Sequence, residues 1–377
     1  MPPVVYRFLL WTGAAGLVLL LLTEAVLWLA FPAKPVTTRV SLTNEIPGLK
    51  PEVDFVIDER STRSWSTKGG AREVSVLVLG GGATAAVLQN DQDTWWGQLG
   101  ERLQKEFPSA SFKVTAFSRE GTGILPAAKW AEKNVPDIKP DVVIAIYGFD
   151  DIVLHPPSYT YDANRLAFTP DGSQQRTGLK KTLYNTSQLV RRFSDSRKKA
   201  GIARAVAPWR TKNAYLDSLK KQRGAYAALP LKYEVERPEG KDPLQEYLDG
   251  IKSLAASAKG VGAAFVVVGE PTLHNGLMGQ LEERLVHRWY IIDAAAAATG
   301  GVVRLDSGWL ELELGRYFTA AEKLCGELGV GFFNPQRKVP ASAQVFVDDT
   351  MFTDPGAAGF ATLLLPVVKP AVAEKVK

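Results

Sequence analysis

The fold class is decided by a short stretch that reads Leu77-Val78-Leu79-Gly80-Gly81-Gly82-Ala83-Thr84. It closes an apolar, β-branched run over residues 74–79 and ends in three glycines, a pattern that indicates a buried strand followed by a tight loop. Residues 95–107 then have helical spacing. The segment therefore predicts a strand, a loop and a helix in succession, which is the repeating unit of an α/β domain.

The same alternation continues along the chain. Apolar runs predict further strands at residues 112–117, 141–147, 263–269 and 302–305, and helical spacing predicts helices at 123–134, 278–298 and 355–365. The strands lack a polar face, as strands do when a parallel sheet is covered on both sides. The expected fold is a doubly wound, parallel five-stranded α/β sheet flanked by helices.

The composition agrees with a globular domain, because 46% of the 377 residues are hydrophobic and 23% are charged. The one cysteine, Cys325, excludes an internal disulfide and a thiolate metal site. We expect a membrane anchor at residues 1–35, a linker at 36–72, the α/β domain at 73–368 with a basic insertion at 156–245, and a tail at 369–377.

The first of these regions is an apolar stretch at residues 8–31, interrupted only by Thr12, Thr23 and Glu24. At about 1.5 Å per residue such a helix crosses a hydrocarbon core of roughly 30 Å. A cleaved signal peptide is the alternative, but the run is longer than a usual signal core and no small-x-small site follows closely. The sequence therefore predicts one transmembrane helix that precedes the α/β domain.

The orientation of this helix does not follow from charge, because Arg7 on one side faces Lys34 and Arg39 on the other. The seven residues before the apolar stretch are more easily left in the cytoplasm than the large domain is. We therefore expect a single-pass protein of a bacterial cytoplasmic membrane, with the large domain on the periplasmic side.

Two further blocks lie where predicted strands end. They read PDVVIAIYGFDD at residues 140–151 and VFVDDTMFTDPG at residues 345–356. Together with the glycine block, they resemble in order and spacing the blocks of the SGNH (GDSL) hydrolases: Gly-Asp-Ser-x-Thr, Gly-x-Asn-Asp and Asp-x-x-His-x-Thr. The resemblance covers residues 73–367, and it implies the same α/β fold.

The residues at the family's catalytic positions are changed. The resemblance places the nucleophilic serine at Gly82, the oxyanion-hole asparagine at Asp150 and the general-base histidine at Met351, and it retains Gly121 and Asp348. Glycine has no oxygen to attack a carbonyl, and methionine cannot accept a proton. The resemblance therefore implies a catalytically degenerate member, and we expect the chain not to be an enzyme.

Two other uses of these blocks stay open. An envelope O-acyl esterase or acyltransferase would need a new nucleophile or base, for which Thr84, Ser118 and His155 are the nearby candidates. A nucleotide-binding domain would use the Gly80-x-Gly82-x-x-Ala85 pattern, with Glu120 at the ribose and Arg119 beside it for a 2′-phosphate.

No metal or cofactor is expected. The three histidines of the chain lie far apart in the sequence, and no cluster has metal-ligand spacing. They are His155, His274 and His287.

Partner binding is expected at two places. An ionisable residue inside an apolar span, Glu24, usually faces another helix, and Gly13 to Gly16 allow close approach of backbones. Residues 176–223 contain fourteen Lys or Arg and two Asp. This charge favours an acidic partner or anionic headgroups, and we expect the contact at Arg191, Arg192, Lys198 and Lys199.

The leading hypothesis is thus a non-catalytic, single-pass accessory or scaffold subunit of an integral membrane complex, for example an energy-transducing one. Nucleic acid is not an expected partner, since no binding motif accompanies the charge.

Overall fold

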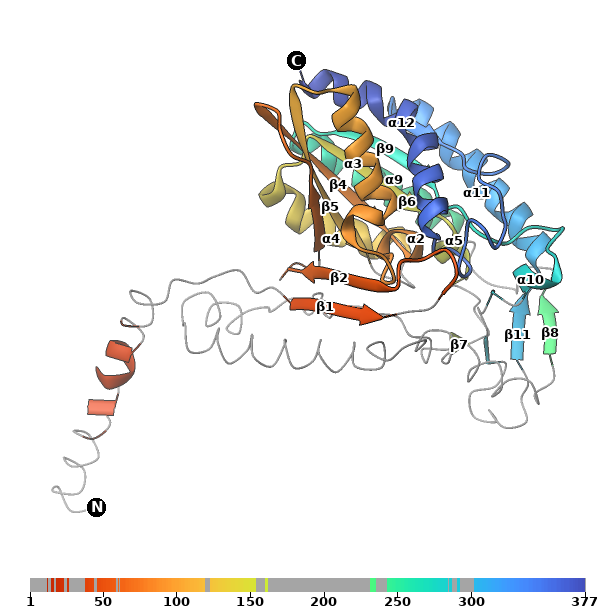
Figure 1. Ribbon diagram of the computed structural model, residues 1–377, viewed down its shortest axis with the longest axis horizontal. Coiled ribbons are helices and arrows are strands. Elements are labelled where there is room, and N and C mark those ends of the chain that lie inside the picture. Colours follow the sequence, from red (N-terminus) through yellow and green to blue (C-terminus); the bar gives the residue numbers. More distant parts are fainter. Residues whose placement is uncertain are drawn as a thin grey trace.

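This computed structural model describes residues 38–118 without 44–45, 59 and 61, residues 123–153, residues 243–286 without 284, and residues 302–376. It also describes residues 12, 15–16, 18–23, 26, 160–161, 231–234 and 290–291. Figure 1 shows the described elements as ribbons, with a central sheet between two layers of helices.

The central sheet has six strands in the order β12-β9-β6-β4-β5-β3. Five of them run parallel: β4 (Arg72–Gly80), β5 (Ala110–Ser118), β6 (Val142–Tyr147), β9 (Ala264–Gly269) and β12 (Gly331–Phe333). The sixth, β3 (Thr62–Ser66), pairs antiparallel with β5. The doubly wound parallel sheet expected from the sequence is confirmed, with an antiparallel strand added at one edge.

Helices cover both faces of this sheet (Figure 1). One face packs against α4 (Ile124–Ile138), α9 (Leu244–Gly260) and α11 (Ser307–Leu328), and the other against α3 (Trp95–Glu106) and α12 (Asp354–Val376). Side chains alternate along each strand, so that Leu77 and Leu79 join the first core whereas Val76 and Val78 join the second. Two apolar layers thus explain why the strands have no polar face.

The position of the fifth parallel strand differs from the expectation. Residues 302–305 form β11 (Val302–Leu305), which belongs to a separate four-stranded sheet in the order β7-β10-β11-β8. The fifth parallel strand is β12, whose three residues are too few to produce a periodic pattern. Two strands of the second sheet come from the expected insertion, namely β7 (Thr160–Tyr161) and β8 (Leu231–Glu234).

The helix expected at residues 278–298 also differs. Within it the structure has only the short α10 (Gln280–Glu283) and the strand β10 (Tyr290–Ile291) among the residues described. The alanine-rich stretch that suggested a longer helix lies outside the described residues.

Residues 36–72, expected to be a linker, contain three strands. β1 (Thr38–Thr43) and β2 (Glu52–Ile57) form an antiparallel hairpin, and β3 joins the central sheet. Alternate residues of β2 are buried, and their side chains form a third apolar cluster with residues that follow β4. The hairpin is therefore part of the folded domain.

Arg63 in β3 connects this hairpin to the loop after β4. Its buried guanidinium donates to Asp91 Oδ1 at 2.8 Å and lies 3.8 Å from the centre of the Phe55 ring. It also donates, at 2.8 to 3.0 Å, to the main-chain carbonyls of Ala85, Ala86 and Gln89. One cation thus satisfies carbonyls that the end of a short helix leaves without intrahelical partners.

Within the described residues, one helix is long and apolar enough to span a membrane when judged by length and composition alone. This helix is α12, and its apolar side chains pack against α3 and the sheet. It continues to Val376 through the expected tail. The predicted transmembrane segment at residues 8–31 lies mostly outside the described residues, so the anchor stays a prediction.

Candidate active site

The glycines after β4 lie against two buried acidic side chains. Gly80 ends β4, and Gly82 begins the short helix α2 (Gly82–Ala85). A Cβ added at Gly81 would lie 2.4 Å from Asp150 Oδ2 and 3.1 Å from Glu270 Oε1. These carboxyl groups occupy the space of a side chain at position 81. A phosphate placed here would meet them, which argues against the nucleotide-binding alternative.

Asp150, at the position of the family's asparagine, lies in α5 (Phe149–Val153), and its N–H donates to Glu270 Oε2 at 3.3 Å. The next residue, Asp151, accepts the N–H groups of Ile124 at 2.8 Å and Gly148 at 3.1 Å. Burial raises the pKa of Asp151 to about 7; the two hydrogen bonds oppose this shift, and the charge of Asp150 adds to it. No group of acidic, histidine or cysteine side chains in the described parts of the chain has the geometry of a metal site.

Met351, at the position of the family's histidine, is a core residue. It packs in the third apolar cluster with Phe55 and Val53 of the hairpin. Asp348 accepts the N–H groups of Thr350 at 2.8 Å and Met351 at 2.7 Å, so its carboxylate closes a turn of its own loop. The last motif block is therefore structural at both of these positions.

The adjacent residue, Asp349, belongs to a second constellation. Its Oδ1 lies 2.8 Å from Nε2 of His274, and Nδ1 of the same imidazole lies 2.9 Å from Oγ of Ser307. The side chains of His274 and Asp349 are buried, and Ser307 is 9% exposed. A hydroxyl, an imidazole and a carboxylate are the three groups that activate a serine nucleophile, although here Nδ1 faces the hydroxyl and Nε2 the carboxylate, the reverse of the usual triad.

Three separate segments bring these residues together. His274 follows β9, Ser307 is the first residue of α11, and Asp349 belongs to the loop before α12. The ring of Phe149 stacks on the imidazole with 5.2 Å between centroids and an interplanar angle of 25°. Thr272 accepts the N–H of His274 and donates to the carbonyl of Asp349, at 3.1 and 2.8 Å. The imidazole is thus fixed on several sides.

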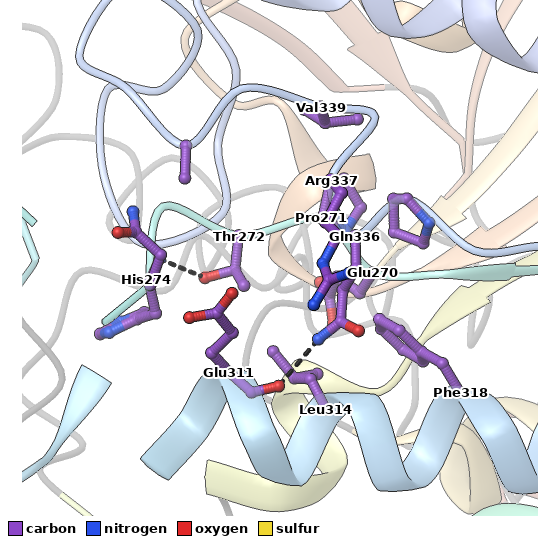
Figure 2. A pocket seen from close by; sticks show the side chains of 13 residues that line it. Glu270, Pro271, Thr272, His274, Glu311, Leu314, Phe318, Gln336, Arg337 and Val339 are labelled. Atoms are coloured by element: carbon purple, nitrogen blue, oxygen red, sulfur yellow. Dashed lines mark hydrogen bonds between the residues drawn. The ribbon is translucent and has the colours of Figure 1, made fainter. Parts of the chain in front are cut away.

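A small cavity of about 60 Å³ lies beside this constellation. Figure 2 shows Thr272 and Glu311 between His274 on one side and Glu270 and Phe318 on the other. The imidazole of His274 points away from these side chains. His274 lines the cavity, whereas Ser307 and Asp349 do not. The side-chain amide of Gln336 donates to the main-chain carbonyl of Glu311 at 2.8 Å, and both residues line the cavity.

Several residues expected from the sequence lie outside the described residues. Gly16 is described and exposed, and Thr84 is buried within α2, but their expected roles stay untested. The structure does not describe Gly13, Glu24, Arg119, Glu120, Gly121, His155, Arg191, Arg192, Lys198 or Lys199.

The sequence matches no family model and no curated protein. Solved structures similar to the chain include a catalytic mutant of Axe2, an acetylxylan esterase from Geobacillus stearothermophilus, with 12% identity, a TM-score of 0.40 and coverage of 80% of this chain and 95% of that one. TesA has 12% identity, a TM-score of 0.40 and coverage of 79% and 99%. The acetyl xylan esterase AlAXEase has 9% identity, a TM-score of 0.38 and coverage of 78% and 100%.

The strand order defines a doubly wound α/β domain, and the order of its three blocks resembles that of the SGNH hydrolases. The expectation that the chain is not an enzyme is contradicted, because the three catalytic positions it considered leave out the hydrogen-bonded side chains of Ser307, His274 and Asp349. The structure adds a serine and a histidine, hydrogen-bonded to each other, at positions outside the motif blocks.

Sequence reasoning missed this serine and histidine because they lie 33 residues apart and belong to no shared motif. Two signals were present. His274 follows the carboxyl end of a predicted strand, where sites of doubly wound sheets gather, and Asp349 belongs to the last block. Ser307 follows Asp306, whose side chain accepts the N–H of Trp309 at 2.8 Å and begins α11.

Proposed function

We propose that this protein is a membrane-tethered serine esterase that cleaves O-acyl esters. In this proposal Ser307 is the nucleophile, His274 the general base and Asp349 the residue that orients the imidazole. The observation that supports it is the pair of hydrogen bonds, 2.9 and 2.8 Å long, that joins the three side chains. The tether is the apolar segment at residues 8–31.

In the proposed reaction the Ser307 oxygen attacks the ester carbonyl while its proton passes to His274. The tetrahedral intermediate collapses, His274 protonates the departing alcohol, and an acyl-enzyme remains on Ser307. A water molecule, deprotonated by His274, then releases the carboxylic acid and restores the serine. The carboxylate of Asp349 stabilises the imidazolium that forms in each half of the reaction.

The location of Ser307 also supports the proposal. It is the first residue of α11, a helix of 22 residues. The amino end of such a helix has a partial positive charge, which favours the negative charge that develops on the substrate oxygen. A buried, stacked imidazole also loses little orientational freedom in the reaction, because its position is fixed beforehand.

Covalent labelling tests this proposal most directly. Full-length protein in mild detergent is treated with a fluorophosphonate, and the labelled peptide is identified by mass spectrometry. We expect one label per chain, on Ser307, and hydrolysis of p-nitrophenyl acetate that falls by about 10³-fold or more in Ser307→Ala. Ser253→Ala is the matched control, because this serine lies on α9 and contacts Glu132 at 3.1 Å. Wild-type protein that neither takes the label nor cleaves the ester would refute the assignment.

A further inference from the structure

Three leucines lie exposed near Ser307. Leu277 is 94% exposed in the loop after β9, Leu281 is 58% exposed on α10, and Leu312 is 77% exposed on α11. Single exposed leucines are common on protein surfaces, but a group of them marks an interaction surface. These three residues are called the leucine patch below.

A hydrogen bond between their neighbouring residues holds two members of the patch together. The N–H of Gly276 donates to Glu311 Oε2 at 2.9 Å, and the next residue on each side is a leucine of the patch. A Cβ on Gly308 would lie 3.5 Å from the Gly276 Cα, so the loop lies directly on the first turn of α11. The leucine patch therefore belongs to the same two segments that hold His274 and Ser307.

The patch and the N-terminal hairpin lie at the same end of the domain. The hairpin packs on residues that directly follow β4, and the leucine patch begins in the loop that follows β9. The carboxyl ends of parallel strands meet at one edge of the sheet, so both features lie beyond that edge. Figure 1 shows β1 and β2 beyond one end of the sheet, with α10 beyond the same end.

The chain between the hairpin and the apolar segment is short. Six residues, 32–37, separate residue 31 from the start of β1. Even fully extended they span only about 20 Å. An apolar segment in a bilayer would therefore keep this end of the domain close to the lipid headgroups.

We infer that the leucine patch rests in the headgroup region of the bilayer that holds the apolar segment, and presents Ser307 to esters at that surface. The inference about the surface rests on the tether, and the inference about the esters rests on the proposed function. Each inserted leucine strengthens the contact about tenfold, because a buried leucine side chain gains roughly the free energy of one decade in affinity.

Fluorescence from single labelled cysteines tests this contact without any need for catalysis. Cys325 is buried, so a thiol-reactive fluorophore modifies an introduced surface cysteine selectively. Leu277→Cys and Leu312→Cys report on the patch, and Leu328→Cys is the matched control on the same helix, about 24 Å away along its axis. Full-length protein is placed in phosphatidylcholine nanodiscs that contain a nitroxide-labelled lipid.

We expect quenching at positions 277 and 312 to exceed that at 328 by at least threefold. Equal quenching at the three positions would overturn the inference. The proposed function has a separate readout, because fluorophosphonate labelling of Ser307 in detergent requires no bilayer. Failure of the membrane contact is therefore distinguishable from failure of the proposed esterase function.

Discussion

Asp348 and Asp349 are adjacent in the chain, but their carboxylates have different partners. Asp348 accepts the N–H groups of Thr350 and Met351, whereas Asp349 contacts the imidazole of His274. Within one motif block, one aspartate closes a turn and the next belongs to the proposed catalytic site.

The different partners of the two aspartates predict different effects. Substitution of Asp349 should impair catalysis, whereas substitution of Asp348 should reduce stability. Asp349→Asn should lower kcat for p-nitrophenyl acetate by about 10⁴-fold, because an amide cannot stabilise the imidazolium. Asp348→Ala should leave fluorophosphonate labelling intact and reduce the free energy of unfolding by about 1 to 3 kcal/mol, because two N–H groups lose their acceptor. Steady-state kinetics measure kcat of both variants, and urea denaturation measures their free energy of unfolding. Equal losses of kcat in the two variants would contradict the assignment of Asp349 to the catalytic site.

The raised pKa of Asp151 predicts how stability changes with pH. Its pKa is about 7 in the folded protein and near 3.8 when unfolded, so between these values the folded state binds more protons. Stability from this group is then fully present below about pH 4 and is lost as pH rises to about 7, by up to roughly 4 kcal/mol. Asp151→Asn should flatten this decline in urea denaturation curves. Asp249→Asn, on the exposed face of α9, should leave the decline between pH 5 and 8 unchanged.

Arg63 should be far more important for stability than its near neighbour Arg60. Arg63→Met leaves Asp91 without its buried cation and removes the donor to three carbonyls, at a cost of about 3 to 5 kcal/mol. Arg60 lies 3.9 Å from Asp137 at the surface, and Arg60→Met should cost about 1 kcal/mol or less. Guanidinium denaturation compares the two; similar losses would mean that Arg63 does not hold the loop.

Two glycine-to-alanine substitutions should change the free energy of unfolding in opposite directions. Gly81→Ala would place a Cβ 2.4 Å from Asp150 Oδ2, and we expect a loss of about 1 to 3 kcal/mol as the carboxyl group is displaced. Gly359 lies in α12 with no atom within 4 Å of an added Cβ, so Gly359→Ala should stabilise the protein by about 0.5 to 1 kcal/mol. Thermal unfolding measures both shifts. A stable Gly81→Ala variant would show that the carboxyl groups can move apart easily.

Partner binding through the anchor and the basic insertion remains a prediction from the sequence. Glu24→Leu should weaken co-purification with another membrane protein while membrane insertion is kept. Charge reversal at Arg191, Arg192, Lys198 and Lys199 should lower association most at low ionic strength, where screening is weak. Co-purification from solubilised membranes measures both, with Leu20→Val as a control; full retention by the combined variant would exclude these contacts.

Much of the fold could be predicted because its central strands are long and apolar. β6 is buried throughout, β4 is buried from Val76 onwards, and α3 has clear helical spacing. The three-residue β12 could not be predicted, since its pairing with β9 depends on tertiary contacts. The hairpin was missed because β2 alternates over only six residues, beside a stretch rich in polar residues.

The candidate site was harder to predict than the fold. The motif positions Gly82, Asp150 and Asp348 could be located because they follow strands or precede α12. The pairing of His274 with Ser307 depends on how a loop lies on the first turn of α11, and no local pattern encodes that contact. The sequence therefore predicts where a site lies more readily than which side chains meet there.

The hairpin also determines where the chain can be cut. Asp354 donates its N–H to the carbonyl of Gly48, and its carboxylate accepts the N–H of Lys50. Deleting everything before the central sheet would remove these bonds and expose Met351 and its apolar neighbours to water. A soluble version of the protein should therefore begin no later than residue 38, and one that begins near residue 70 should aggregate.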